Sequence, residues 1–151
     1  MEFNKPVSNP LLVGAIELLR EDETEKYKKM FWAEVLKAEY LMPVSITPPP
    51  LRGKNGAMRI TEGSNIQFPT IGTEDGKQYL MAFTDKKEYD KWKPDAEKYM
   101  FTLTFDDYVS LLLKKDPEGN SNKTQGFIIN PCTSNIIMPK ELIAQLISMR
   151  N

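Results

Sequence analysis

The sequence predicts an α+β fold, a single domain in which a mixed, mostly antiparallel β-sheet packs against about five α-helices. The first observation is a set of three apolar, β-forming runs that each end at a polar capping or turn residue: 79–85, 101–107 and 126–131. The second is that the first two runs lead into segments with helical periodicity. The third is that 151 residues, 40% of them hydrophobic, are enough for one sizeable core. We therefore expect one domain over residues 1–151.

Two helices are expected near the start of the chain. Asn9 followed by Pro10 is typical of a helix N-terminus, and apolar residues at helical spacing continue to about Arg20. The next stretch begins with acidic residues and continues with lysines, which is the polarity that stabilises a helix. The ion pairs expected within this second helix are Asp22 with Lys26 and Glu25 with Lys29.

A strand is expected over residues 40–46, and the run Pro48-Pro49-Pro50 must end it because proline cannot donate a ladder hydrogen bond. Residues 47–65 are rich in proline, glycine and polar side chains, which indicates a long excursion with a short strand at 57–60. The next two strands, 66–71 and 78–83, flank Asp75-Gly76, a strong hairpin signal, so we expect them to pair antiparallel.

A short third helix is expected after the strand that ends at Phe83. Asp85 is its predicted N-cap and Glu88 the reciprocal partner, while Pro94 prevents the helix from continuing beyond Trp92. Alternating residues then predict a strand over 99–104.

The last third of the chain predicts a helix, a loop, a hairpin and a final helix. The helix covers residues 104–115, and the polar residues 116–125 are expected to form an exposed loop. Residues 127–129 and 136–138 are the strands of a second hairpin with its turn at 130–135, and Pro139 is expected to open the last amphipathic helix.

The composition excludes several classes of function. Twenty Lys+Arg against 21 Asp+Glu give a formal net charge of -1, so there is no basic excess to attract nucleic acid or an anionic membrane. No histidine occurs, which excludes imidazole catalysis and histidine ligands. The single cysteine, Cys132, cannot form an internal disulfide. With neither an export signal nor a membrane span in the sequence, we expect a cytoplasmic protein.

The motifs that resemble chemical sites have structural explanations. Residues 72–77 resemble a phosphate-binding loop, but they are too short and lead into a strand. Ser121 and Phe127 occupy the positions where a calcium loop requires glycine and glutamate. Cys132 has no histidine to activate it, and Asp106-Asp107 is explained by capping of a helix. We therefore expect no catalytic residue, no metal site and no cofactor.

The order of the elements resembles the N-terminal domain of the SseB (enhanced serine sensitivity) family of bacteria. The matching motifs are the strand-to-helix step at 80–85 with Trp92 ending the helix, the helix start at 105–108, and the strand at 126–131 before a final amphipathic helix. The similarity extends from about Asn9 to Ile147. It implies a bacterial, cytosolic α+β domain and identifies no catalytic residue to carry over.

A noncatalytic binding or regulatory module that recognises a protein partner or itself is the leading hypothesis. The aromatic residues are mostly explained by core packing, except Trp92, which lies beside lysines and a proline at a helix end. The candidate binding residues are Trp92, Asn130, Pro131, Arg52 and Arg59, the last two in the excursion. One alternative is a small-ligand-binding protein or histidine-independent enzyme with the excursion as a lid. Another is an immunity or chaperone partner of a secreted protein.

Overall fold

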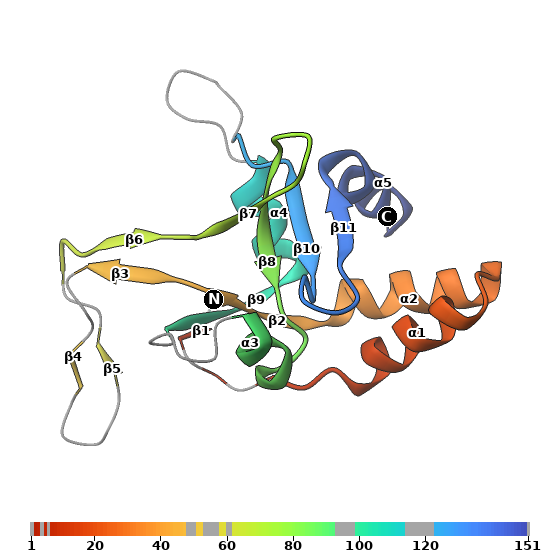
Figure 1. Ribbon diagram of the computed structural model, residues 1–151, viewed down its shortest axis with the longest axis horizontal. Helices are drawn as coiled ribbons and strands as arrows, with labels where there is room; N and C mark the ends of the chain where they lie inside the picture. Colours follow the sequence, from red (N-terminus) through yellow and green to blue (C-terminus); the bar gives the residue numbers. More distant parts are fainter. Residues whose placement is uncertain are drawn as a thin grey trace.

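The computed structural model describes residues 2–3, 5, 7–47, 51–52, 58–59, 62–92, 99–113 and 123–150 (Figure 1). The helices are α1 Pro10–Glu21, α2 Glu25–Lys37, α3 Lys86–Trp92, α4 Phe105–Leu113 and α5 Lys140–Arg150. The strands are β1 Glu2–Phe3, β2 Glu39–Pro43, β3 Ser45–Thr47, β4 Leu51–Arg52, β5 Met58–Arg59, β6 Asn65–Gln67, β7 Thr70–Gly72, β8 Gln78–Ala82, β9 Met100–Thr104, β10 Gly126–Ile129 and β11 Ile136–Pro139. The fold is α+β, as the sequence predicts.

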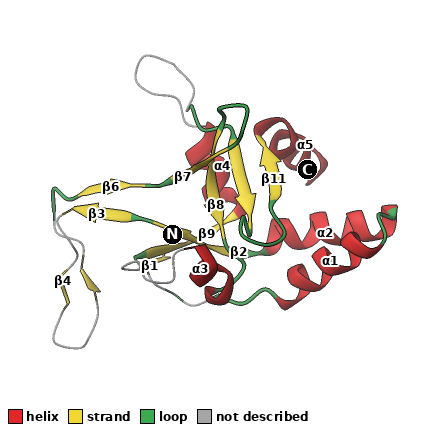
Figure 2. Cartoon of the chain, viewed as in Figure 1, coloured by secondary structure: helices red, strands yellow, loops and turns green. Residues whose placement is uncertain are grey.

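A mixed four-stranded sheet with the order β11-β10-β8-β7 forms the centre of the molecule. Strands β8 and β10 run parallel, and the other neighbours are antiparallel. The antiparallel sheet β1-β9-β2 adjoins it through backbone hydrogen bonds between Leu41 and Phe83. Helices α1, α2 and α5 lie on one side of the molecule, α3 and α4 lie beside the central strands, and the ribbon β3–β6 extends on the opposite side (Figure 2).

Two of the predicted strands are divided because they change partners along their length. The 40–46 strand becomes β2, which pairs with β9, and β3, which pairs with β6. The 66–71 strand becomes β6 and β7, and β7 pairs with β8. Pro43 and Pro69 stand at or beside these switches, and proline supplies no ladder donor. The Asp75-Gly76 hairpin is confirmed, with Gly76 at φ 81°.

The N-terminus of α1 is where the sequence predicts it, but Asn9 does not cap the helix with its side chain. Its Nδ2 atom instead donates to the carbonyl oxygens of Glu39 and Thr84, each at 2.7 Å. This amide therefore connects the start of α1 to two separate strand ends. These hydrogen bonds depend on the tertiary structure, so the local capping rule does not predict them.

The start of α2 differs from the prediction. Thr24 is its N-cap and accepts a hydrogen bond from the amide of Tyr27 at 3.1 Å, so Asp22 precedes the helix and the Asp22 to Lys26 helical pair is wrong. Glu25 forms its ion pair with Lys28 at 3.7 Å, one residue earlier than predicted.

The caps of the two central helices follow local rules. Asp85 accepts a hydrogen bond from the amide of Glu88 at 2.9 Å, as expected for the start of α3. The predicted return bond from Glu88 is not formed among the described residues, because the Glu88 carboxylate accepts from Lys91 and Thr133 instead. At α4, Thr104 and Asp107 exchange hydrogen bonds in a reciprocal capping box, which supports the capping interpretation of the acidic pair there. Asp106 forms an ion pair with Arg150 at 2.9 Å.

The last helix begins one residue later than expected, because Pro139 still belongs to β11 and pairs with Gly126. Several predictions fall on residues 48–50, 94 and 114–122, which lie outside the described residues. The short strand expected at 57–60 is found as β5, paired with β4.

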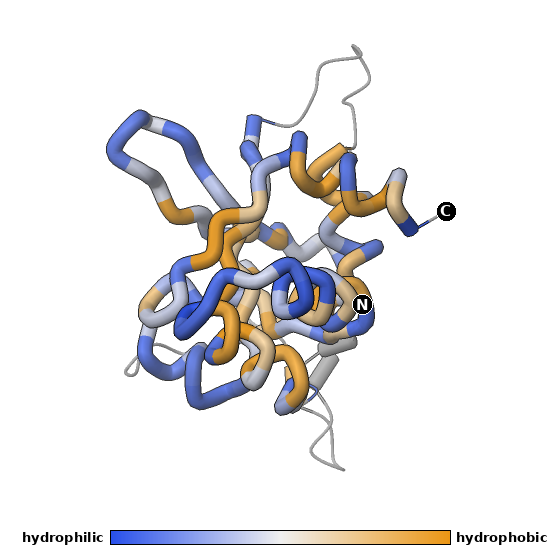
Figure 3. Tube along the Cα trace, turned by 90° about the vertical axis from the view of Figure 1, so that its right-hand side faces the viewer, coloured by the Kyte–Doolittle hydropathy of each residue, from blue (hydrophilic) through white to orange (hydrophobic). Residues whose placement is uncertain are grey.

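The core lies between the sheets and the helices, and hydrophobic residues concentrate on the central elements in Figure 3. The rings of Tyr108 and Phe127 are 4.6 Å apart, and Tyr40 packs against both. Both of these tyrosine hydroxyls have a partner: Tyr108 donates to Met81 O at 2.7 Å and Tyr40 to Val35 O at 2.9 Å. Tyr40 is therefore a core residue, in agreement with the expectation that core packing explains most of the aromatic residues.

These two tyrosines predict a loss of stability at alkaline pH. Burial raises the pKa of Tyr40 and Tyr108 in the folded protein, so the unfolded chain ionises first as pH rises. Their contribution is complete below a pH of about 10 and should fall above it by about 1.4 kcal/mol per pH unit for each tyrosine. Urea unfolding between pH 8 and 11 measures this slope. Tyr40→Phe and Tyr108→Phe should each flatten it, and an unchanged slope in both variants would contradict the assignment.

Candidate functional site

The only parallel strand pair among the described elements has its carboxyl ends next to a crevice. Strand β8 continues into α3, while β10 continues into the turn at residues 130–135. Because the chains diverge after adjacent parallel strands, such ends are a common position for ligand sites in open α/β sheets. The chains also diverge after β8 and β10, so the ends of this parallel pair are a candidate position for a ligand site even though the sheet is mixed.

Asn130 fixes the shape of the turn. It is only 3% exposed and has a left-handed backbone with φ 49°. Its Oδ1 atom accepts a hydrogen bond from the amide of Thr84, and its Nδ2 atom donates to the Thr84 hydroxyl, both at 3.0 Å. Its carbonyl oxygen accepts from the amides of Thr133 and Asn135. The two parallel strand ends are therefore joined by one amide side chain.

A polar cleft of about 370 Å³ lies between α1, α3 and this turn. Its lining residues are Val13, Ile16, Glu17, Arg20, Asp85, Lys87, Glu88, Lys91, Asn130, Thr133 and Ser134. Two of its carboxylates are engaged within the protein. Asp85 accepts from the Thr84 hydroxyl and the Glu88 amide, and Glu88 accepts from Lys91 at 3.0 Å and Thr133 at 2.9 Å.

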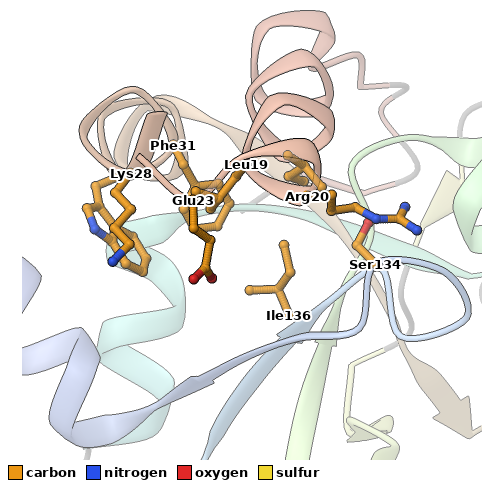
Figure 4. A pocket seen from close by; sticks show the side chains of 9 residues that line it. Leu19, Arg20, Glu23, Lys28, Phe31, Ser134 and Ile136 are labelled. Atoms are coloured by element: carbon orange, nitrogen blue, oxygen red, sulfur yellow. The ribbon is translucent and has the colours of Figure 1, made fainter. Parts of the chain in front are cut away.

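An apolar pocket of about 420 Å³ adjoins the cleft between α1, α2 and the start of β11 (Figure 4). Its lining residues are Ile16, Leu19, Arg20, Glu23, Lys28, Phe31, Trp32, Ser134 and Ile136. Ile16, Leu19, Phe31, Trp32 and Ile136 form most of the wall, and Arg20, Glu23 and Lys28 are its charged members. The ring of Trp32 packs against Phe31 with centroids 4.8 Å apart, so two aromatic faces are held in place.

The pocket and the cleft share Ile16, Arg20 and Ser134, and together we call them the α1–turn groove. Among the described residues, neither Arg20 nor Lys87 forms an ion pair, whereas Lys91 is paired with Glu88. Unpaired cations on α1 and α3 therefore line the same cleft. They can take part in binding without breaking an existing ion pair.

A third hollow of about 390 Å³ lies on the outer face of the α1–α2 pair. Leu11 and Met30 contribute exposed apolar surface, with 71% and 41% of their area accessible, and Leu18 adds to the lining. Glu17 and Glu21 stand at its edge. This outer face is separate from the apolar pocket between α1, α2 and β11.

The structure brings only part of the predicted site residues to the groove. Asn130 lines the polar cleft, with its side chain bonded to Thr84, and Pro131 follows it half-buried in the turn. Trp92 packs against Phe83 and Tyr89 and does not line the groove.

The remaining two candidates lie in the β4–β5 hairpin. Arg52 pairs with Met58 in backbone register and Arg59 with Leu51, while the side chains of both arginines lie outside the described part of the structure. Their binding role, like that of Trp92, Asn130 and Pro131, stays a prediction.

Sequence reasoning did not identify Arg20, Lys87, Trp32 or Ser134 as site residues. Arg20 is in the last turn of α1, where a cation is favoured by the helix dipole alone, and Lys87 is one of several surface lysines. No pattern in the local sequence around Arg20 or Lys87 indicates that the two residues lie close together. A pocket requires the positions of three elements that are far apart in the sequence.

The described residues contain no group of three or more histidine, cysteine, aspartate or glutamate side chains placed to hold a metal ion. No helix in that part of the chain has the length and hydrophobicity needed to cross a membrane. Cys132 is exposed in the turn. The groove combines an apolar pocket with charged and hydrogen-bonding groups, an arrangement suited to recognising an amphipathic ligand.

Comparison with known protein families identifies a match over most of the chain. The family model described as the SseB protein N-terminal domain matches residues 12–145. No curated protein and no solved structure matches the chain. The matched range contains every residue that lines the α1–turn groove.

Proposed function

The chain belongs to the SseB N-terminal domain family, and we propose that it is a noncatalytic binding module that holds a segment of a partner protein in the α1–turn groove. The observation that carries this proposal is the shared wall between an apolar pocket and a polar cleft. Partner proteins are commonly anchored by one large side chain in a pocket with polar contacts around it.

The chemistry of the cleft favours recognition over catalysis. Asp85 and Glu88 are the acids closest to the strand ends, and both are engaged in capping and side-chain bonds that stabilise α3 and the turn. A general acid or base must be free to exchange a proton with its substrate. These two carboxylates serve instead as supports for the walls of the groove.

A regulatory role in the bacterial cytoplasm is part of the same proposal. The single, exposed Cys132 is typical of a reducing compartment, and the balanced charge gives no electrostatic attraction to nucleic acid. The resemblance to the SseB family also implies a bacterial, cytosolic domain. The partner is therefore expected among cytoplasmic proteins.

Filling the groove should weaken partner binding. Ser134 lines both the pocket and the cleft, so in Ser134→Trp an indole would occupy the space of the ligand. Affinity capture from a native lysate, followed by mass spectrometry, should identify a protein retained by the wild type and weakened by about tenfold or more in this variant. Ser110→Trp is the matched control, since Ser110 is exposed on α4 and lines neither hollow.

Equal capture by both tryptophan variants would contradict a partner site in the groove. Retention of further copies of the chain alone would assign the role to self-association. In that case the exposed apolar surface around Leu11 and Met30 on the outer face of α1 and α2 is the interface to test.

A further inference from the structure

We propose that the α1–turn groove recognises the carboxyl terminus of a protein whose last residue is large and apolar. The terminal side chain enters the apolar pocket, and the terminal carboxylate lies in the polar cleft between Arg20 and Lys87. This inference rests on the proposed function and names the chemistry of the segment that the groove binds.

The shared wall sets the spacing between the two groups of the ligand. Arg20 and Ser134 line the pocket and the cleft at once, so the apolar group and the anion that contact them must be close together. A terminal residue carries its side chain and its carboxylate on the same Cα atom. An internal acidic residue that follows an apolar one has its Cα about 3.8 Å further along the chain, with the carboxylate on a side chain of its own.

The charges of the cleft favour a carboxylate at this position. Arg20 on α1 and Lys87 on α3 face the cleft from different walls and form no ion pair among the described residues. Asp85 and Glu88 are already bonded within the protein. Glu17, one turn before Arg20 on α1, also lines the cleft and forms no ion pair among the described residues, so the bound carboxylate must lie on the side of Arg20 and Lys87. A carboxylate therefore meets two available cations, one of them a guanidinium that can donate two parallel hydrogen bonds.

The direction of Arg20 supports this role. A cation in the last turn of a helix can bond the free carbonyl groups of that turn. Figure 4 shows the side chain extended away from α1, on the side where the turn carries Ser134. The guanidinium is thus placed at the junction of the pocket and the cleft.

Glu23 provides the remaining polar contact. Its side chain belongs to the short connection between α1 and α2 and points into the pocket in Figure 4. The terminal residue of a peptide has one backbone N–H, which can donate to this carboxylate. A free amino acid would offer an ammonium group instead, so the two ligands are distinguishable by experiment.

The test compares N-acetyl-L-phenylalanine with its primary amide, by ¹H–¹⁵N chemical-shift titration of the full chain. We expect the acid to bind about tenfold more tightly, the ratio that one charge-assisted contact provides. Arg20→Gln should remove this preference by weakening the acid alone, and Lys87→Gln should reduce it. Lys86→Gln is the matched control, because Lys86 pairs with Asp90 at 3.2 Å and does not line the groove.

Equal affinity for the acid and the amide, or a preference that survives Arg20→Gln, would overturn the inference. Tighter binding of free L-phenylalanine would identify an amino acid as the ligand and would overturn it too. Equal or tighter binding of N-acetyl-Phe-Glu amide would do the same by assigning the carboxylate to an internal acidic residue. Arg20 is exposed, so these variants are expected to fold, and the dispersion of their spectra verifies this.

The capture experiment separates this inference from the function on which it rests. A captured partner that is lost in Ser134→Trp but is still bound after its own carboxyl terminus is extended leaves the binding function in place and overturns the terminal recognition. A partner that needs both an open groove and a free carboxyl terminus supports the two together.

Discussion

Gly126→Ala is expected to lower the free energy of unfolding by about 3 kcal/mol or more. A Cβ atom at this position would lie 2.0 Å from the carbonyl oxygen of Met138 and 2.9 Å from the Cα atom of Pro139. Both atoms belong to the backbone of β11, which pairs with β10 and leads directly into α5. The hydrogen bond from Lys140 N to Gln125 O, at 2.9 Å, holds the same position. Urea unfolding measures the loss.

Gly14→Ala is the matched control for this prediction. Gly14 is in the interior of α1, and an added Cβ atom would meet nothing within 4 Å. The change should stabilise the protein by about 0.5–1 kcal/mol, because alanine favours a helix more than glycine does. If the two Gly→Ala variants had the same stability, the close approach of β10 and β11 would not be the reason that position 126 requires glycine.

Asn130→Ala is expected to lower the free energy of unfolding by about 2–4 kcal/mol. The change removes both hydrogen bonds to Thr84. The buried backbone amide of Thr84 is then left without an acceptor. It also places alanine in a left-handed conformation at φ 49°. Asn130→Gly removes the bonds without the backbone strain, so its loss should be smaller. The difference between the two variants measures the backbone contribution.

Asn135→Ala is the control for the backbone effect. Asn135 has nearly the same conformation, φ 50°, but it is exposed, and its amide bonds to the Asn130 carbonyl through the main chain. Its loss should be limited to about 1 kcal/mol. Equal losses at positions 130 and 135 would show that the Thr84 bonds contribute little, and the Asn130 turn would then not be the support of the polar cleft.

The outcome at Asn130 also bears on binding. Because this residue joins the ends of β8 and β10, its replacement is expected to loosen the turn that carries Thr133 and Ser134. An effect of Asn130→Ala on partner capture would therefore arise through the shape of the cleft. Ser134→Trp fills the groove and leaves the hydrogen bonds between Asn130 and Thr84 in place. Comparing the two variants therefore distinguishes an effect on the shape of the cleft from direct blocking of the ligand.

The sequence predicted the elements whose signals are local. Asp75-Gly76 indicated a hairpin because its turn requires a residue with positive φ, which Gly76 provides. Asp85 indicated the start of α3 because the cap and its target amide are three residues apart. These interactions involve neighbours along the chain, so their pattern is present before the chain folds.

The partner changes in the sheets were not predictable in this way. The register of β3 against β6 depends on residues that are about 20 positions apart in the chain, and nothing in a single run of residues specifies which strand will lie beside it. Asn9 shows the same limit. A local rule correctly predicts that α1 begins after Asn9. The Asn9 side chain, however, donates a hydrogen bond to the carbonyl oxygen of Thr84, 75 residues away.

The sequence alone determined the fold class, the family resemblance and a turn at Asn130-Pro131. The tertiary structure alone decided that this turn faces α1 and α3, that the Asn130 side chain is committed to Thr84, and that Arg20 and Lys87 line one cleft. The physical reason is that burial of the apolar faces of α1, α2 and the central sheet sets which surfaces meet, and this burial involves the whole chain at once. Charged side chains at the edges of those surfaces are brought together as a consequence, from positions that carry no signal of each other.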